Sequence, residues 1–83
     1  MSDQIRLLLA RLRKRLEGTY GVRLRGLYLY GSFARGSEDA ESDVDVIIVL
    51  ERIDAYGAEV ARTSALNSEL SLESGLSISR VFV

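Results

Sequence analysis

Two aspartates separated by one residue, Asp43 and Asp45, are the side chains of this chain best suited to chemistry. Asp45 lies within the β-branched apolar run 44–50, which predicts a strand, and residues two apart in a strand point to the same face. Carboxylate oxygens are the ligands that Mg²⁺ prefers, commonly one or two of them together with substrate phosphates. An isolated Asp-x-Asp more often only solvates the start of a strand, so the pair alone is weak evidence for a metal site.

A second pair, Gly31-Ser32, lies where a predicted strand, 24–30, ends and a short helical turn begins. Backbone N–H groups at the start of a helix bind anions, and glycine lets a phosphate approach the backbone. The same residues could also form a plain turn with Ser32 as the helix cap. Arg35 is close enough in sequence to add positive charge, although an arginine on a short exposed helix is usually only solvated. A phosphate-binding turn and metal-binding carboxylates in one short segment together predict a nucleotide site.

The composition restricts what such a site can be made of. The chain has no cysteine and no histidine, so thiolate and imidazole ligands are excluded and any metal site must use oxygen. The net charge is -1, yet seven of the eleven basic residues precede position 26 and eight of the twelve acids lie between 38 and 59. A basic stripe on an amphipathic helix is more often a solvated face than a nucleic-acid surface. Nucleic acid is therefore not the expected partner.

Length and hydropathy indicate one small globular domain, residues 1–83. Hydrophobic residues make up 47% and charged residues 28% of the chain, as in ordinary folded domains. So short a chain has a small stability margin, which favours burial against a partner or a second copy. Arginines interrupt the N-terminal leucines, and no run approaches the roughly 20 apolar residues of a membrane span. We therefore expect a cytoplasmic location and no membrane association.

The apolar spacing predicts the elements that position the site. Residues 3–17 form an amphipathic helix that ends near Gly18. Strands follow at 24–30 and 44–50, the second expected to be covered on both faces. A helix over 55–73, a glycine cap at Gly75 and a strand over 76–83 complete an α-β-(α)-β-α-β order, typical of one α/β domain. The tyrosines are expected in the core or at its boundary rather than as a base-stacking platform: Tyr20, Tyr28, Tyr30 and Tyr56.

The motif as a whole resembles that of the DNA polymerase β nucleotidyltransferase superfamily. Gly31-Ser32 is followed by Asp43-x-Asp45, within the stretches 27–36 and 42–49. These stretches are similar to the prokaryotic minimal nucleotidyltransferases, among them the MntA-like antitoxins that are partnered with HEPN-domain proteins. The resemblance implies an α/β (α+β) nucleotidyltransferase fold with a small mixed three-stranded sheet. In it a leading helix precedes two antiparallel strands that carry the motif, and a second helix returns to a third strand.

The resemblance also implies an activity. This activity is the transfer of a nucleoside monophosphate to a hydroxyl of a partner protein, with Mg²⁺ or Mn²⁺ as cofactor. ATP, which donates AMP, is expected as the substrate ahead of other nucleoside triphosphates. Asp43 and Asp45 would be the catalytic metal ligands, and Gly31 and Ser32 would hold the β and γ phosphates. A HEPN-type protein is the partner that the resemblance implies.

One departure from the family pattern stands out, because active members use a third carboxylate on the next strand. Residues 76–83 contain no acid, and the nearest one, Glu73, precedes them. Three alternatives stay open: a two-carboxylate enzyme with weak or partner-assisted chemistry, a domain truncated at its C-terminus, or a non-catalytic antitoxin or partner-binding module with a degenerate nucleotide site. An exposed edge on the third strand also favours a homo-oligomer.

Overall fold

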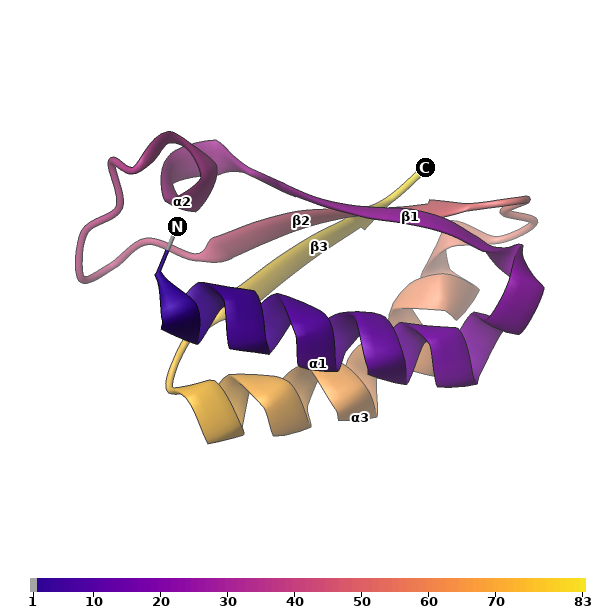
Figure 1. Ribbon diagram of the computed structural model, residues 1–83. Coiled ribbons are helices and arrows are strands. Elements are labelled where there is room, and N and C mark those ends of the chain that lie inside the picture. The colour runs from indigo at the N-terminus through magenta and orange to yellow at the C-terminus, as the bar shows by residue number, and fades with distance from the viewer. Residues whose placement is uncertain (1) are drawn as a thin grey trace.

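The computed structural model describes residues 2–83 and shows a three-stranded sheet with helices (Figure 1). The strand order is β1-β2-β3, with β1 antiparallel and β3 parallel to β2. This confirms the mixed sheet and the α-β-(α)-β-α-β order. The elements are α1 (Asp3–Tyr20), a 3₁₀ turn (Gly21–Arg23), β1 (Leu24–Tyr30), α2 (Gly31–Arg35), β2 (Val44–Leu50), α3 (Tyr56–Ser74) and β3 (Ile78–Phe82).

One face of the sheet forms the core with α1 and α3, which lie on the same side of it (Figure 1). Burial alternates along β2: Val44, Val46, Ile48 and Leu50 are buried against the helices, and the residues between them are half-buried. Neither α1 nor α3 covers the opposite face (Figure 1), and within residues 2–83 only the short α2 contacts β1 and β2 from elsewhere, so the expectation that β2 is covered on both faces was wrong. β-branched residues suit a half-buried surface as well as a buried one, which is why an unbroken apolar run did not distinguish the two.

The end of α1 differs from the prediction, because the helix continues through Gly18 to Tyr20. Gly21 then ends it with a φ of 56°, and its N–H donates to the Glu17 carbonyl. A glycine inside a helix costs about 1 kcal/mol relative to alanine. Tyr20 offsets this cost here, since its side chain is buried and its hydroxyl donates to Glu59 at 2.8 Å.

The outer edge of β3 is partly occupied by side chains of α3. The Tyr56 hydroxyl accepts a hydrogen bond from the Phe82 N–H at 3.1 Å, and Asn67 Nδ2 donates to the Ile78 carbonyl at 3.3 Å. The strand is also shorter than predicted. Fewer backbone groups are therefore free on this edge than the sequence suggested, which weakens edge pairing as a reason for self-association.

The outer surfaces of α1 and α3 are joined by ion pairs. Arg15 pairs with Glu69 at 2.7 Å, and Arg11 pairs with Glu73 at 3.4 Å. All four side chains are about half exposed, so each pair adds little stability. Part of the basic stripe of α1 is thus already matched by acids. None of the helices described is long and apolar enough to cross a membrane.

Candidate active site

The two halves of the Gly-Ser and Asp-x-Asp motif meet at the end of β1. Tyr30, the last residue of β1, pairs directly with Asp45 on β2, and Gly31 follows as the first residue of α2. Gly31 has a φ of +73°, and a Cβ added there would lie 3.1 Å from Asp45 Cγ and collide with the carboxylate oxygen. The Asp45 carboxylate therefore packs on the Gly31 backbone, where no side chain fits.

The start of α2 leaves its backbone donors uncapped by side chains. Its N-cap residue, Tyr30, makes no side-chain capping bond, and Ser32 is half-buried in the first turn. The helix ends after one turn at Gly36, whose N–H donates to the Ser32 carbonyl. Arg35 is exposed and forms no ion pair with any of residues 2–83. It remains a candidate for phosphate binding by position alone.

Asp43 lies one residue before β2 and is exposed, whereas Asp45 is half-buried within the strand. The loop before them is ordered by Asp39, whose Oδ1 accepts from the Glu41 N–H at 2.9 Å and whose N–H donates to Ser42 Oγ at 3.0 Å. Within the described part of the chain, neither the Asp43 nor the Asp45 carboxylate has a hydrogen bond or an ion pair. Both carboxylates are free to bind a cation.

The third strand places Ser79 directly beside Asp45 in the parallel register. Its neighbour Arg80 points the other way, toward α3, where Nε donates to Thr63 Oγ1 at 2.8 Å and Nη2 donates to the Val60 carbonyl at 2.9 Å. Residues 2–83 contain no group of three acidic, histidine or cysteine side chains that could hold a metal. Two free carboxylates still fit Mg²⁺, because Mg²⁺ takes its remaining ligands from water and substrate phosphates.

Comparison with known proteins decides the family. A family model for the nucleotidyltransferase domain matches residues 9–78, which include all four motif residues. The chain belongs to this family. No curated protein and no solved structure matches it. Membership supports nucleotidyl transfer as the general activity of the domain.

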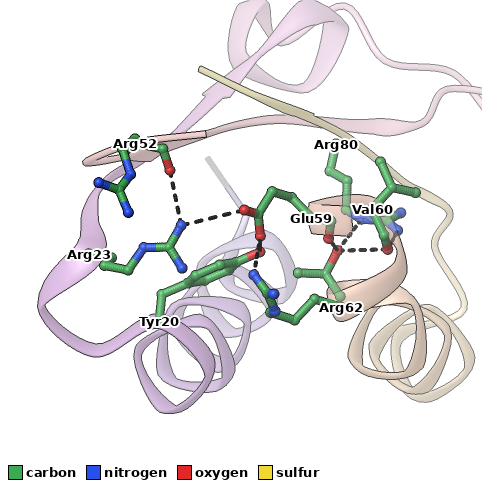
Figure 2. A network of polar contacts seen from close by, with 8 residues as sticks. Tyr20, Arg23, Arg52, Glu59, Val60, Arg62 and Arg80 are labelled. Atoms are coloured by element: carbon green, nitrogen blue, oxygen red, sulfur yellow. Dashed lines mark hydrogen bonds and ion pairs between the residues drawn. The ribbon is translucent and has the colours of Figure 1, made fainter. Parts of the chain in front are cut away.

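The nucleotidyltransferase domain also contains a buried acid that sequence reasoning missed. Glu59 is 3% exposed and accepts hydrogen bonds from Tyr20 at 2.8 Å, Arg62 at 2.6 Å and Arg23 at 3.4 Å (Figure 2). The guanidinium groups of Arg23 and Arg62 also lie over the Tyr20 ring, 5.5 and 6.0 Å from its centre. One feature of the sequence could have indicated that Glu59 is buried: its spacing places it on the same side of α3 as the buried Leu66 and Leu70.

This network is structural rather than catalytic, because of where it lies and how it titrates. Arg23 precedes β1 and Asp45 lies where β1 ends, so the two sites are separated by about 20 Å of strand. Burial opposes ionisation of Glu59, but the Tyr20 hydrogen bond and the charges of Arg62 and Arg23 outweigh it and lower its pKa below 4.5. Burial, together with the hydrogen bond to Glu59, raises the pKa of Tyr20 to about 12. Neither group changes protonation near neutral pH.

Replacing Ser79 tests the geometry of the candidate metal site. We expect Ser79→Asp to tighten Mn²⁺ binding by about tenfold, close to 1.4 kcal/mol, because it adds a negative charge beside Asp45. The concentration of free Mn²⁺, followed by electron paramagnetic resonance, measures this. Asparagine is close to aspartate in size but carries no charge, so Ser79→Asn should leave the Mn²⁺ affinity at the wild-type value. Equal affinities for both variants would contradict the placement of Ser79 beside a cation site.

Proposed function

We propose that this nucleotidyltransferase domain transfers a nucleoside monophosphate, AMP from ATP in the first instance, to a hydroxyl of a partner protein in a reaction that needs Mg²⁺ or Mn²⁺. The observation that carries the proposal is the packing of the Asp45 carboxylate on Gly31. It joins the candidate metal ligands and the candidate phosphate-binding turn in one site.

Each residue of the site would have a separate role in such a transfer. Asp43 and Asp45 would hold the cation, which when bound supplies positive charge against the phosphate oxygens. The N–H groups of Gly31 and Ser32 would bind the β and γ phosphates, with the Arg35 guanidinium as an added charge. The acceptor oxygen forms a bond to the α-phosphorus, the bond to pyrophosphate breaks, and the hydroxyl proton is released. Positioning and charge neutralisation are the main demands of this chemistry.

A macromolecular acceptor suits the open surface next to Asp45. We call this surface the bare face of the sheet and define it by the residues that share one side of the strands: Tyr28, Tyr30, Asp45, Ile47, Val49, Ser79 and Val81. Of the helices described, only the single-turn helix α2 lies beside it, whereas small acceptors are usually held in enclosing pockets. We propose a HEPN-type protein as the partner. Light scattering of the domain alone and with that protein measures both self-association and the complex.

The two aspartates provide the test of the proposed transfer. With α-labelled ATP, Mg²⁺ and the partner, we expect Asp43→Asn and Asp45→Asn each to lower the rate at least about 100-fold, as for the loss of other charge-stabilising groups. Glu41→Gln is the matched control, because Glu41 is an exposed acid of the same loop, and it should keep the wild-type rate. Transfer that persists in both aspartate variants would exclude the proposed site.

A non-catalytic binding module is the second candidate, and one observation favours it. Ser79, not an acid, lies beside Asp45 on β3. Under this alternative the Asp43→Asn/Asp45→Asn double variant still binds and neutralises the partner, and mass spectrometry finds no modified partner. Under the transfer proposal the double variant still binds but no longer modifies it, while the wild type does.

A further inference from the structure

The four tyrosines of the domain fall into two structural groups. Tyr20 donates a hydrogen bond to Glu59, and Tyr56 accepts one from the Phe82 N–H. The hydroxyls of Tyr28 and Tyr30 bond to no other residue in the range 2–83, and these side chains are 58% and 38% exposed. Tyr20 alone is buried and meets the expectation of a core place, because the Tyr56 side chain is 45% exposed although its hydroxyl is bonded.

Strand pairing puts Tyr30 beside the Asp45 carboxylate. Tyr30 is the direct partner of Asp45, and opposite residues on one face have Cβ atoms about 4.5–5.5 Å apart. Tyr28 is one pair further along, opposite Ile47. Its ring lies over Gly26, where an added Cβ would be 2.7 Å from Tyr28 Cε2, so it leans toward the start of β1. Only Tyr30 of this pair is next to the site.

The length of the side chain distinguishes Tyr30 from the nearby serine. Ser79 also flanks Asp45, but its hydroxyl stays as close to the sheet as the carboxylate does. A tyrosine hydroxyl projects further from the strand than a carboxylate. It therefore reaches the level at which a phosphate bound above Asp45 would lie, and reacting atoms need to approach to about 3–3.5 Å.

We propose that the Tyr30 hydroxyl is an acceptor of the nucleotidyl group within its own chain. The inference rests on the proposed function, since it uses the same nucleotide and the same carboxylates. Tyr30 Oη forms a bond to the α-phosphorus of a nucleoside triphosphate, the bond between that phosphorus and the bridging oxygen breaks, and pyrophosphate leaves. The phenolic proton passes to water, and the product is a phosphodiester on Tyr30.

The modification would limit itself. A nucleoside monophosphate on Tyr30 would occupy the bare face beside Asp45 and Gly31, where the next nucleotide has to bind. Each chain would accept one group, and a chain modified in this way would no longer serve a partner protein.

The experiment uses the purified chain alone with α-labelled ATP and Mn²⁺ or Mg²⁺. Intact mass spectrometry should show one added nucleoside monophosphate per chain. Cleavage after Arg25 and Arg35 releases residues 26–35, which contain Tyr28 and Tyr30, and fragment ions place the group on Tyr30. Label should fall at least tenfold in Tyr30→Phe and in Asp45→Asn, and should persist in Tyr28→Phe, the matched control. Circular dichroism checks that the variants are folded.

Other outcomes separate this inference from the proposed function. ATP binding measured by calorimetry without any label on Tyr30 overturns the inference and leaves transfer to a partner in place. Label on a residue other than Tyr30 also overturns the inference and leaves transfer to a partner in place. Label on an Asp45→Asn chain mixed with the wild type shows transfer between chains and overturns the step within one chain. Absence of ATP binding overturns both proposals.

Discussion

Glu59→Ala is expected to lower the free energy of unfolding by about 2–3 kcal/mol, chiefly because a buried hydroxyl is left without its acceptor, whereas the Arg23 and Arg62 side chains are 36% and 45% exposed and stay solvated. The Tyr20 hydroxyl would lose its acceptor, and Arg23 and Arg62 would lose their carboxylate. Domains are stable by only about 5–15 kcal/mol in total, so this change removes much of the margin. Chemical denaturation followed by circular dichroism at neutral pH measures it.

Glu69→Ala on the same helix is the matched control. Glu69 pairs with Arg15, but its side chain is 54% exposed, and exposed pairs contribute at most about 1 kcal/mol. A loss for Glu59→Ala no larger than that for Glu69→Ala would contradict the role given to the network.

Glu59→Gln tests how the stability contribution of Glu59 depends on pH. The folded pKa of Glu59 lies below 4.5, so its contribution is present above 4.5 and is lost as the pH falls through the folded value, a loss that the glutamine variant lacks.

Gly31→Ala is expected to abolish nucleotide and metal binding as well as to destabilise the fold. Alanine at a φ of +73° costs about 1–2 kcal/mol in backbone strain, and its Cβ would also displace the Asp45 carboxylate. Calorimetry with ATP and Mn²⁺, together with chemical denaturation, measures both effects.

Gly36→Ala isolates the effect of backbone strain on stability. Gly36 has the same φ of +73°, but an added Cβ there meets nothing within 4 Å. The free energy of unfolding of this variant should therefore fall only by the strain energy, and its affinity for ATP and Mn²⁺ should be unchanged. If the two alanine variants bound ATP equally well, the contact between Gly31 and Asp45 would have no part in the site.

The motif and most of the elements were predictable because they depend on local sequence. The glycine at the end of β1, the apolar run of β2 and the cap at Gly75 all act within a few residues. The end of α1 was not predictable, since the helix is carried past Gly18 by the contact of Tyr20 with Glu59, a residue far along the chain.

The remaining features of the site depend on strand register. The row formed by Tyr30, Asp45 and Ser79 crosses three strands, and no spacing in the sequence predicts which residues share it. The same holds for the uncovered side of the sheet, because an apolar strand does not reveal where the helices lie. The sequence thus predicted which residues form the motif but not the side chains next to them.

The side chains of α3 on the edge of β3 bear on how the protein resists aggregation. Unpaired strand edges recruit other chains, and natural proteins block them with bulges, charges or covering elements. β1 carries an irregularity between Leu24 and Gly26 and an exposed ion pair from Arg25 to Glu51, and β3 is capped by Tyr56 and Asn67. Because the cap at Tyr56 is at the first turn of α3, close to Glu59, loosening that turn uncovers an edge that can start intermolecular sheet growth.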